Sequence, residues 1–355
     1  DDDRNRFWLE ITGLDKKVFY KIIDIIQNKK VLISGSWSLQ RQQYGEQPHW
    51  MIVVLAAMIG QIGQPGGGFG LGYSAENGIG NPVKHFKWPA LNQFKNLITD
   101  FIPVARYSDM LLNPGKNFTF NGQTYQYPNI KLVYWAGGNP FHHQMNLSKL
   151  RKATFKPDTI ITNEIWWNSL ARHADIIFPT TTTLERNDIG FRHWEQTVSP
   201  MHKAIDPIGN SRNDFDIFSL ISEKLGIKEQ FTENKNEEEW LKTLWDEAKE
   251  SARENNFYLP DFDQFWNGGF FEVLKPTHEQ ILMEDFVKKP GQFPLSNRSK
   301  KIEIFSDEVD SFNYSDCPGH PKWLEPKEWL GSNLTKKYPL HVISGQPENL
   351  SLIHI

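Results

Sequence analysis

Cysteine is nearly absent, because Cys317 is the single one among 355 residues. One cysteine cannot form a disulfide within the chain, and it cannot supply the set of thiolates that holds a zinc ion or an iron–sulfur cluster. Long apolar runs are missing too: the longest, residues 51–59, falls far short of the roughly 20 residues that cross a bilayer. We interpret that run as a buried helix and predict no direct membrane span.

Strong charge of either sign is also lacking. The 39 lysine and arginine residues and the 43 aspartate and glutamate residues give a formal net charge of -4. Proteins that bind nucleic acid through its phosphates need a strongly basic surface, so the composition argues against nucleic acid as a partner. The length suggests about two or three globular domains.

Several catalytic motifs are missing as well. The sequence contains no G-x-S-x-G, Walker A or H-E-x-x-H motif, which argues against a serine hydrolase, a nucleotide triphosphatase and a zinc protease. Glycines are dense between residues 66 and 72, but they follow a predicted helix. The G-x-G-x-x-G fingerprint of NAD-binding domains follows a strand, so such a domain is disfavoured.

The first part of the chain reads as helix, strand, loop and helix. Apolar residues recur at helical spacing between positions 18 and 26, which predicts an amphipathic helix. The apolar run 31–34 predicts a buried strand, and Pro48 suits the first turn of a long apolar helix that reaches about residue 62. Residues 63–80 are too rich in glycine for regular structure, so we expect a loop there.

Three strand-like apolar runs follow in close succession at residues 131–135, 159–162 and 174–178. Each run ends in loop-forming residues, and the runs are separated by helical or loop segments. This order favours a parallel sheet with right-handed crossovers, hence an α/β fold. In such sheets ligands bind at the edge where the carboxyl ends of the strands meet.

The second half of the chain is more irregular. Asn213 or Asp214 is predicted to cap a helix, and a second amphipathic helix contains residues 240–248. The chain is then rich in proline, glycine and aromatic residues. The clear strand patterns there are residues 301–305 and the apolar start at 338–343.

Four local clusters carry side chains suited to ligand binding. Residues 36–41 offer hydroxyl, amide and guanidinium donors beside an indole, which suits a phosphate and a flat ring. Residues 137–140 combine two glycines with Asn-Pro and precede two histidines, so the backbone can approach a bulky ligand closely. Residues 171–175 and 180–188 place carboxylates and hydroxyls at the expected sheet edge, where they suit guanine, ribose or phosphate.

Each cluster also has a structural alternative. His142, His143 and His173 lack partners at the spacing of a zinc site, which argues against a metal site made of them. The neighbouring charges Glu185-Arg186, and Arg172 with Asp175, are equally compatible with ordinary ion pairs. The residues alone leave both interpretations open.

Taken in order, these motifs resemble the middle of the molybdopterin oxidoreductases of the dimethyl sulfoxide reductase branch, which includes trimethylamine N-oxide and biotin sulfoxide reductases. The likeness runs along nearly the whole chain. The motifs that carry it are Trp37-Ser38-Leu39-Gln40-Arg41, Pro65-Gly66-Gly67-Gly68-Phe69-Gly70, Trp135-Ala136-Gly137-Gly138-Asn139-Pro140, Arg172-His173-Ala174-Asp175, Leu184-Glu185-Arg186-Asn187-Asp188 and Asp316-Cys317-Pro318-Gly319-His320-Pro321.

The resemblance implies a division of the chain into parts of a larger fold. It implies parallel-sheet, dinucleotide-binding-like α/β domains, then an irregular α+β segment and the start of a C-terminal β-barrel domain. Residues 1–125 would close one α/β cofactor-binding domain, and residues 126–228 would form a second. Residues 229–335 would belong to the substrate-funnel domain, and residues 336–355 would begin the barrel. The last residues, 350–355, depart from the family pattern, and the sequence does not tell whether they are native.

The resemblance also implies a cofactor, molybdenum bound by two molybdopterin guanine dinucleotides. The serine that ligates the metal in this branch would lie upstream, so no catalytic residue and no metal ligand is expected in this chain, and Ser36 and Ser38 are not that serine. Trp37, Ser38, Gln40 and Arg41 would contact one dinucleotide. The remaining expected contacts to pterin, phosphate or guanine are Gly138, Asn139, His143, Glu164, His173, Arg186 and Asp188.

The activity implied is reduction of an S-oxide or N-oxide such as dimethyl sulfoxide, trimethylamine N-oxide, or biotin or methionine sulfoxide, with two electrons and two protons. Alternatives are another oxidoreductase of the superfamily, of the thiosulfate, polysulfide or formate type, and a non-catalytic structural relative. The electron donor would be a membrane-anchored c-type cytochrome or a cytoplasmic reductant. The periplasm is favoured over the cytoplasm, and the sequence does not select one oxide.

We predict that these 355 residues by themselves bind no molybdenum and have no reductase activity, because the metal ligand and the barrel would lie outside them. The measurement is oxidation of reduced benzyl viologen by trimethylamine N-oxide with the purified chain. Activity above the rate without protein would contradict the prediction.

Overall fold

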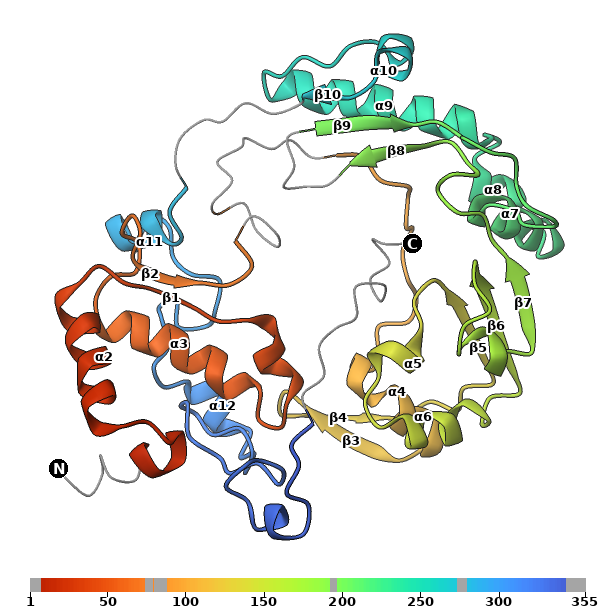
Figure 1. Ribbon diagram of the computed structural model, residues 1–355. Coiled ribbons are helices and arrows are strands. Elements are labelled where there is room, and N and C mark those ends of the chain that lie inside the picture. The colour runs from red at the N-terminus through yellow and green to blue at the C-terminus, as the bar shows by residue number, and fades with distance from the viewer. Residues whose placement is uncertain (1–7, 74–78, 80–87, 192–196, 273–279, 343–355) are drawn as a thin grey trace. The chain divides into compact units, whose positions relative to one another are not determined.

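The computed structural model describes residues 8–73, 79, 88–191, 197–272 and 280–342 (Figure 1). They belong to two compact units, residues 1–83 with 276–344, and residues 84–275 with 345–355. The four-part division expected from the sequence stays a prediction, and most of the expected barrel start lies outside the described residues.

The first unit contains the predicted helix, strand and helix. α2 (Lys16–Asn28) begins after Asp15, whose side chain accepts a hydrogen bond from Lys17 N at 2.8 Å. β1 is Leu32–Ser34 and α3 is Glu46–Met58, with Pro48 in its first turn. α3 ends before residue 62 because Gly60, at φ +70°, adopts the left-handed conformation that terminates helices.

The glycine-rich segment is not wholly a loop, so that expectation was wrong in part. β2 (Gly68–Gly70) pairs in parallel with β1, with Ile33 opposite Phe69. A Cβ at Gly68 would lie 3.1 Å from the backbone of Ile62, so glycine lets this strand pass close to the turn after α3. Glycine here serves a close approach of two backbone segments.

The later part of the first unit has no strand at residues 301–305 or among the described residues 338–342, so both predictions were wrong there; residue 343 lies outside the described residues. Trp50 Nε1 donates to the backbone oxygen of Glu303 at 2.9 Å, which occupies one of the acceptors that a strand would use. The short helices of this unit are η1 (Trp37–Arg41), α11 (Glu284–Lys288), α12 (Asp307–Ser311) and η4 (Asn333–Lys336).

The second unit contains the predicted parallel sheet, with strand order β5-β6-β7. The strands are β5 (Leu132–Ala136), β6 (Thr159–Glu164) and β7 (Ile176–Pro179). Both pairings are parallel, and Ile161 of β6 lies opposite Tyr134 on one side and Ile176 on the other. α6 (Leu147–Thr154) lies between β5 and β6 in sequence and buries Leu150 completely. The α/β expectation is therefore confirmed for this part of the chain.

A β-hairpin that precedes β5 in the sequence was not predicted. β3 (Asn117–Phe120) and β4 (Gln123–Gln126) pair antiparallel across a two-residue turn. Asn121 and Gly122 have φ values of 48° and 71°, as a type I′ turn requires. The Asn-Gly pair was the signal that the periodicity analysis missed.

The remainder of the second unit combines a small antiparallel sheet with helices. Its strand order is β10-β9-β8. Asn213 caps α7 as predicted, since its side chain accepts from Asp216 N at 2.8 Å. Trp245 is fully buried and stacks on Phe265, with ring centroids 3.7 Å apart. The elements are α4 (Tyr107–Leu112), α5 (Pro140–His143), β8 (Asp188–Phe191), β9 (Thr197–Met201), α7 (Asp214–Lys224), α8 (Lys228–Thr232), α9 (Glu237–Glu254), α10 (Phe262–Gly268) and β10 (Phe271–Glu272). Among the described residues, no helix has the length and apolar content to cross a membrane.

Candidate functional site

A cavity of about 410 Å³ lies where the carboxyl ends of β5, β6 and β7 meet. Because the three strands are parallel, the loops that follow them all emerge at this edge. The cavity is lined by residues of these three loops and by the start of α7, namely residues 136–139, 142, 143, 163–166, 168, 180–183, 186 and 214.

The loop after β5 is shaped by two glycines. Gly137 and Gly138 have φ values of 112° and 78°, which side chains other than glycine rarely adopt. Apart from the glycine itself and its two chain neighbours, no heavy atom of the described residues lies within 4 Å of the position that a Cβ would take at either residue. Backbone is therefore exposed to the cavity without a side chain in front of it.

Asn139 follows the glycines and uses one side of its amide for the fold. Its Oδ1 accepts from Phe141 N at 3.0 Å and caps the short helix α5. Its Nδ2 is buried and has no hydrogen-bond partner among the described residues. The Asn139 side chain lines the cavity, and its amide nitrogen is a donor without a partner there.

Two threonines of the loop after β7 repeat this pattern. The Oγ1 atoms of Thr180 and Thr181 are buried and have no partner among the described residues. Leaving a buried polar group unsatisfied costs about 1–3 kcal/mol. Since Thr180, Thr181 and Asn139 all line the same cavity, its wall holds three polar atoms that a bound ligand could satisfy.

Glu164 at the end of β6 organises its own loop. Its Oε1 accepts from Ile165 N at 3.0 Å, and its Oε2 accepts from Asn168 Nδ2 at 2.7 Å. Asn168 in turn accepts from Ala171 N at 3.0 Å. The carboxylate therefore positions the loop that carries the exposed Trp166 at the cavity wall.

Glu185 connects the loop after β7 to a segment about 20 residues further along the chain. One carboxylate oxygen accepts from the backbone N and the Oγ1 of Thr182, both at 2.8 Å. The other accepts from Ile208 N at 2.7 Å and from Ser211 Oγ at 3.3 Å. These bonds, those to the backbone of Thr182 and Ile208 first, lower the pKa of Glu185 from 4.5 to about 2.

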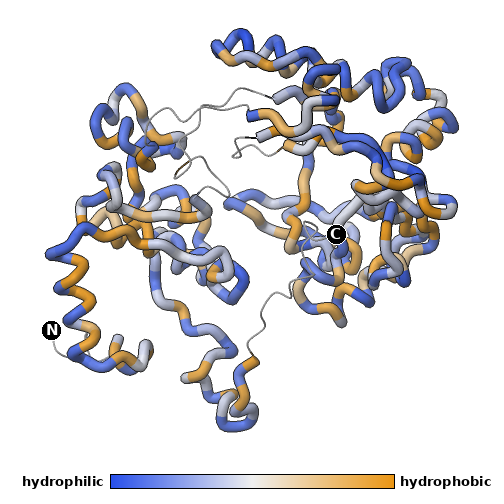
Figure 2. The backbone as a smooth tube through the Cα atoms, turned by 45° about the horizontal axis from the view of Figure 1, so that its top comes forward, coloured by the Kyte–Doolittle hydropathy of each residue, from blue (hydrophilic) through white to orange (hydrophobic). Residues whose placement is uncertain are grey.

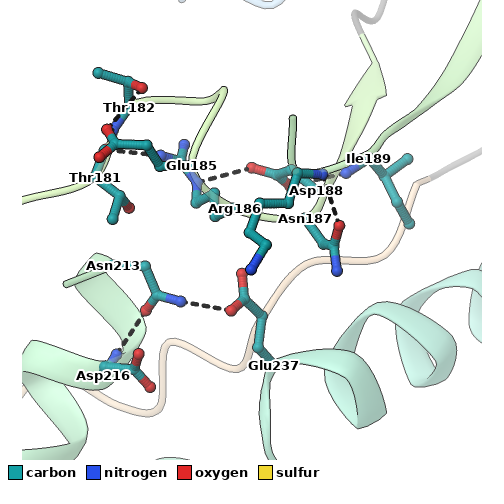
Figure 3. Close-up of polar contacts among 11 residues, drawn as sticks. Thr181, Thr182, Glu185, Arg186, Asn187, Asp188, Ile189, Asn213, Asp216 and Glu237 are labelled. Atoms are coloured by element: carbon teal, nitrogen blue, oxygen red, sulfur yellow. Dashed lines mark hydrogen bonds and ion pairs between the residues drawn. The ribbon is translucent and has the colours of Figure 1, made fainter. Parts of the chain in front are cut away.

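Arg186 lies between the cavity and the next strand. Its Nη1 donates to the backbone oxygen of Thr181 at 3.0 Å, and its Nε lies 3.5 Å from Asp188 Oδ2. Asp188 also accepts from Ile189 N at 2.9 Å, at the start of β8 (Figure 3). Glu185 and Arg186 thus have different partners. Asp175, which the sequence analysis weighed as an ion-pair partner of Arg172, accepts a hydrogen bond from Ile160 N of β6 at 2.8 Å.

The structure gathers part of the predicted set of site residues. Gly138, Asn139, His143, Glu164 and Arg186 line the cavity. Asp188 is not among the lining residues but pairs with Arg186.

His173 does not line the cavity either. Its ring stacks on Phe141 of α5 at a centroid distance of 4.4 Å, and its Nδ1 lies 2.7 Å from the backbone oxygen of Ser169. His173 therefore packs against α5 through Phe141. A direct contact between His173 and a cofactor stays a prediction.

The remaining predicted residues, Trp37, Ser38, Gln40 and Arg41, form η1 of the first unit. All four side chains are exposed. Ser36 begins this turn, because its Oγ accepts from Ser38 N at 3.3 Å and from Ser38 Oγ at 3.0 Å. Their assignment to a dinucleotide stays a prediction. Among the described residues, no group of three or more His, Cys, Asp or Glu side chains could hold a metal ion.

One chain of hydrogen bonds that reaches the cavity through Asn163 and Asp214 was missed by the sequence analysis. Tyr134 OH donates to Asn163 Oδ1 at 2.8 Å, and Asn163 Nδ2 donates to Asp214 Oδ1 at 2.7 Å. Burial, and then the charge of Asp214, raise the pKa of Tyr134. The three residues come from β5, β6 and α7, so no local pattern in the sequence could have joined them.

Replacing Glu185 by glutamine tests the tie between the loops. The folded pKa of about 2 lies below the ordinary 4.5, so the carboxylate stabilises the fold above about pH 4.5 and loses that effect as the pH falls toward 2. We expect Glu185→Gln to lower the melting temperature near neutral pH, and the difference from the wild type to shrink between about pH 4.5 and pH 2.

Glu223→Gln is the matched control, because Glu223 pairs with Lys228 at the surface, where both side chains are about half exposed. It should leave the melting temperature near neutral pH almost unchanged. A pH-independent difference between Glu185→Gln and wild type would contradict the role of the Glu185 charge.

Comparison with known proteins identifies a family that this chain matches. The family model described as "Molybdopterin oxidoreductase" matches residues 15–224. Biotin sulfoxide reductase of Cereibacter sphaeroides is 41% identical over 95% of this chain and 45% of its own length. Trimethylamine-N-oxide reductase of Haemophilus influenzae is 41% identical over 95% of this chain and 43% of its own length.

A solved structure, acetylene hydratase from Pelobacter acetylenicus, matches 63% of this chain and 28% of its own chain, with 17% sequence identity and a TM-score of 0.44. This chain spans less than half the length of the curated relatives that it matches. The family model covers more than half of the chain, including the sheet and the cavity at its edge. The chain therefore belongs to the molybdopterin oxidoreductase family.

Proposed function

We propose that this chain is the part of a molybdenum-dependent S-oxide or N-oxide reductase that holds one face of the cofactor. The observation that carries the proposal is the cavity at the sheet edge, with two uncovered glycines and three buried polar atoms without partners. The relatives named as biotin sulfoxide and trimethylamine-N-oxide reductases support the substrate class. The electron donor and the periplasmic location stay predictions.

The residues of the cavity fit a pterin cofactor. The cavity volume of about 410 Å³ is in the range of small-molecule sites. Gly137 and Gly138 allow a flat ring to approach the backbone, and Asn139 Nδ2 is available to donate to it. When bound, the molybdenum cofactor supplies the two-electron chemistry of oxygen-atom removal. The chain's own residues bind and orient it.

The dinucleotide form of the cofactor is supported by a second cavity in the same unit. This cavity, of about 1070 Å³, shares Thr181 and Arg186 with the first one and extends along α7 to the start of α9. A dinucleotide is long enough to need both spaces. Arg186 lies at their junction, where a guanidinium can pair with a phosphate.

Glu237 lines the second cavity, and its carboxyl group has a shifted pKa. Its pKa is raised by burial, then by Asp216 and Asp188, although Asn213 Nδ2 donates to its carboxylate (Figure 3). A carboxyl group suits the N–H donors of a guanine. This contact is part of the proposal for the dinucleotide form.

The full-length protein that contains this chain tests the proposed activity. We expect it to contain molybdenum, measured by elemental mass spectrometry, and to oxidise reduced benzyl viologen with trimethylamine N-oxide, dimethyl sulfoxide or biotin sulfoxide. Molybdenum without turnover of any S-oxide or N-oxide, but with turnover of formate, thiosulfate or polysulfide, would support another branch of the family. Protein without molybdenum would support a non-catalytic relative.

Asn139→Ser tests the donor at the cavity wall. Serine keeps an oxygen that can cap α5 and is neutral, but it removes the Nδ2 donor. We expect cofactor binding by the full-length protein to weaken by about twofold to tenfold, since a hydrogen bond between neutral groups contributes roughly 0.5–1.5 kcal/mol. The readout is the cofactor concentration needed to load the apoprotein.

Asn146→Ser is the matched control, because Asn146 caps α6 through its side-chain oxygen and lines neither cavity. It should leave loading unchanged. Equal loading of Asn139→Ser and Asn146→Ser would show that the Asn139 amide does not contact the cofactor.

A further inference from the structure

Trp166 is an exposed tryptophan at the wall of the cavity at the sheet edge. It is 57% exposed and lines that cavity. Two other tryptophans of the second unit pack on aromatic neighbours, since Trp245 stacks on Phe265 and the ring centroid of Trp135 lies 5.4 Å from that of Tyr107. Exposed apolar residues are spread over both units, so exposure by itself does not mark a site (Figure 2). The position of Trp166 at the cavity is what distinguishes it.

The backbone of Trp166 is hydrogen-bonded on both sides. Its N donates to Glu164 Oε1 at 3.4 Å, and its O accepts from Asn168 N at 2.8 Å. Glu164 Oε2 accepts from Asn168 Nδ2 at 2.7 Å, and Asn168 Oδ1 accepts from Ala171 N at 3.0 Å. Hydrogen bonds therefore hold the loop at the residue that carries the indole. An aromatic side chain on a fixed backbone loses little conformational entropy when it contacts a ligand.

The rest of the cavity wall suits a planar ring with polar edges. The loop after β5 presents two glycines, whose backbone a ring can approach closely. Asn139 Nδ2 and the Oγ1 atoms of Thr180 and Thr181 are buried and have no partners among the described residues. Such polar atoms can pair with the edge of a ring, whereas a flat apolar side chain is needed to cover its face. Among the described residues that line the cavity, the indole of Trp166 is the largest aromatic surface.

We propose that the indole of Trp166 stacks on the planar ring of the bound cofactor. The ring is the bicyclic system with an amino group and a keto oxygen that pterin and guanine share. An indole face and a planar ring bury apolar surface against each other, which favours binding. The inference rests on the proposed cofactor site, but it does not depend on which substrate the protein reduces.

The neighbouring residue Trp167 separates this proposal from a general role of exposed aromatic residues. Trp167 is 65% exposed, but it does not line the cavity. A polypeptide surface that packs on this loop would contact exposed indoles inside and outside the cavity. A planar ligand in the cavity contacts Trp166 and leaves Trp167 outside. The two residues therefore form a pair that is matched in type and in exposure.

The experiment compares Trp166→Leu with Trp167→Leu in the cofactor-free full-length protein. The probes are guanosine diphosphate and hydroxymethylpterin, which carry the ring in its two forms. We expect Trp166→Leu to weaken binding of at least one probe by at least about fivefold, as the loss of one stack between a base and an aromatic side chain does. Trp167→Leu should leave both dissociation constants unchanged. Titration calorimetry measures the constants.

Two further readouts distinguish stacking from a structural role of Trp166. Trp166→Phe keeps an aromatic ring, so it should retain most of the affinity that Trp166→Leu loses. Stacking of a ring on an exposed indole also quenches the emission of that indole. Saturation with the probe that stacks should therefore quench tryptophan emission in the wild type and in Trp167→Leu, and quench it much less in Trp166→Leu.

The two probes also identify the part of the cofactor that Trp166 contacts. Loss of affinity for guanosine diphosphate alone assigns the stacked ring to the guanine end, and loss for hydroxymethylpterin alone assigns it to the pterin end; both results support the proposal. Equal affinities of Trp166→Leu and the wild type for both probes, equal losses in Trp166→Leu and Trp167→Leu, or no binding of either probe to the wild type would overturn it. The proposed function fails by a different result, namely a full-length protein without molybdenum or without turnover of any S-oxide or N-oxide.

Discussion

The parallel direction of β5, β6 and β7 is the constraint on which the candidate site depends. It brings the ends of three loops to one edge, although their residues are up to 50 positions apart in the sequence, from Ala136 to Arg186. Parallel strands need crossover connections, and here α5 and α6 lie between the first two strands in sequence. The loops at the edge can carry glycine, amide and hydroxyl groups without disturbing the sheet.

Within this edge, some polar groups serve the fold and others are left for a ligand. Glu164 accepts from donors of its own loop, and Glu185 accepts both from its own loop and from Ile208, so the two carboxylates fix the loops. Asn139 divides its amide, with the oxygen capping α5 and the nitrogen unpaired. Thr180 and Thr181 keep unpaired hydroxyls beside it. A rigid loop with unsatisfied donors is the arrangement expected of a pre-formed binding site.

The two units differ in how completely they bury their apolar residues. The second unit encloses Trp245, Phe265 and Leu150, each at most 1% exposed. The first unit exposes Ile22, Leu32 and Met58 on three successive elements. This contrast is what a piece of a longer family member would show if one of its domains were assembled from separated stretches of the polypeptide. Family membership and the uncovered surface of the first unit thus have one common explanation.

The sequence by itself determined the local elements and the family. Periodicity predicted α2 and β5 to β7, Asn213 marked the start of α7, and the ordered motifs indicated the molybdopterin oxidoreductases. It misassigned residues 301–305, where Trp50 bonds to the backbone of Glu303, and it missed the chain from Tyr134 through Asn163 to Asp214. Such contacts join residues far apart in the sequence, so neither propensity nor spacing encodes them. Only the tertiary structure decided which donors stay unpaired, because that depends on which partners the fold brings within hydrogen-bond distance.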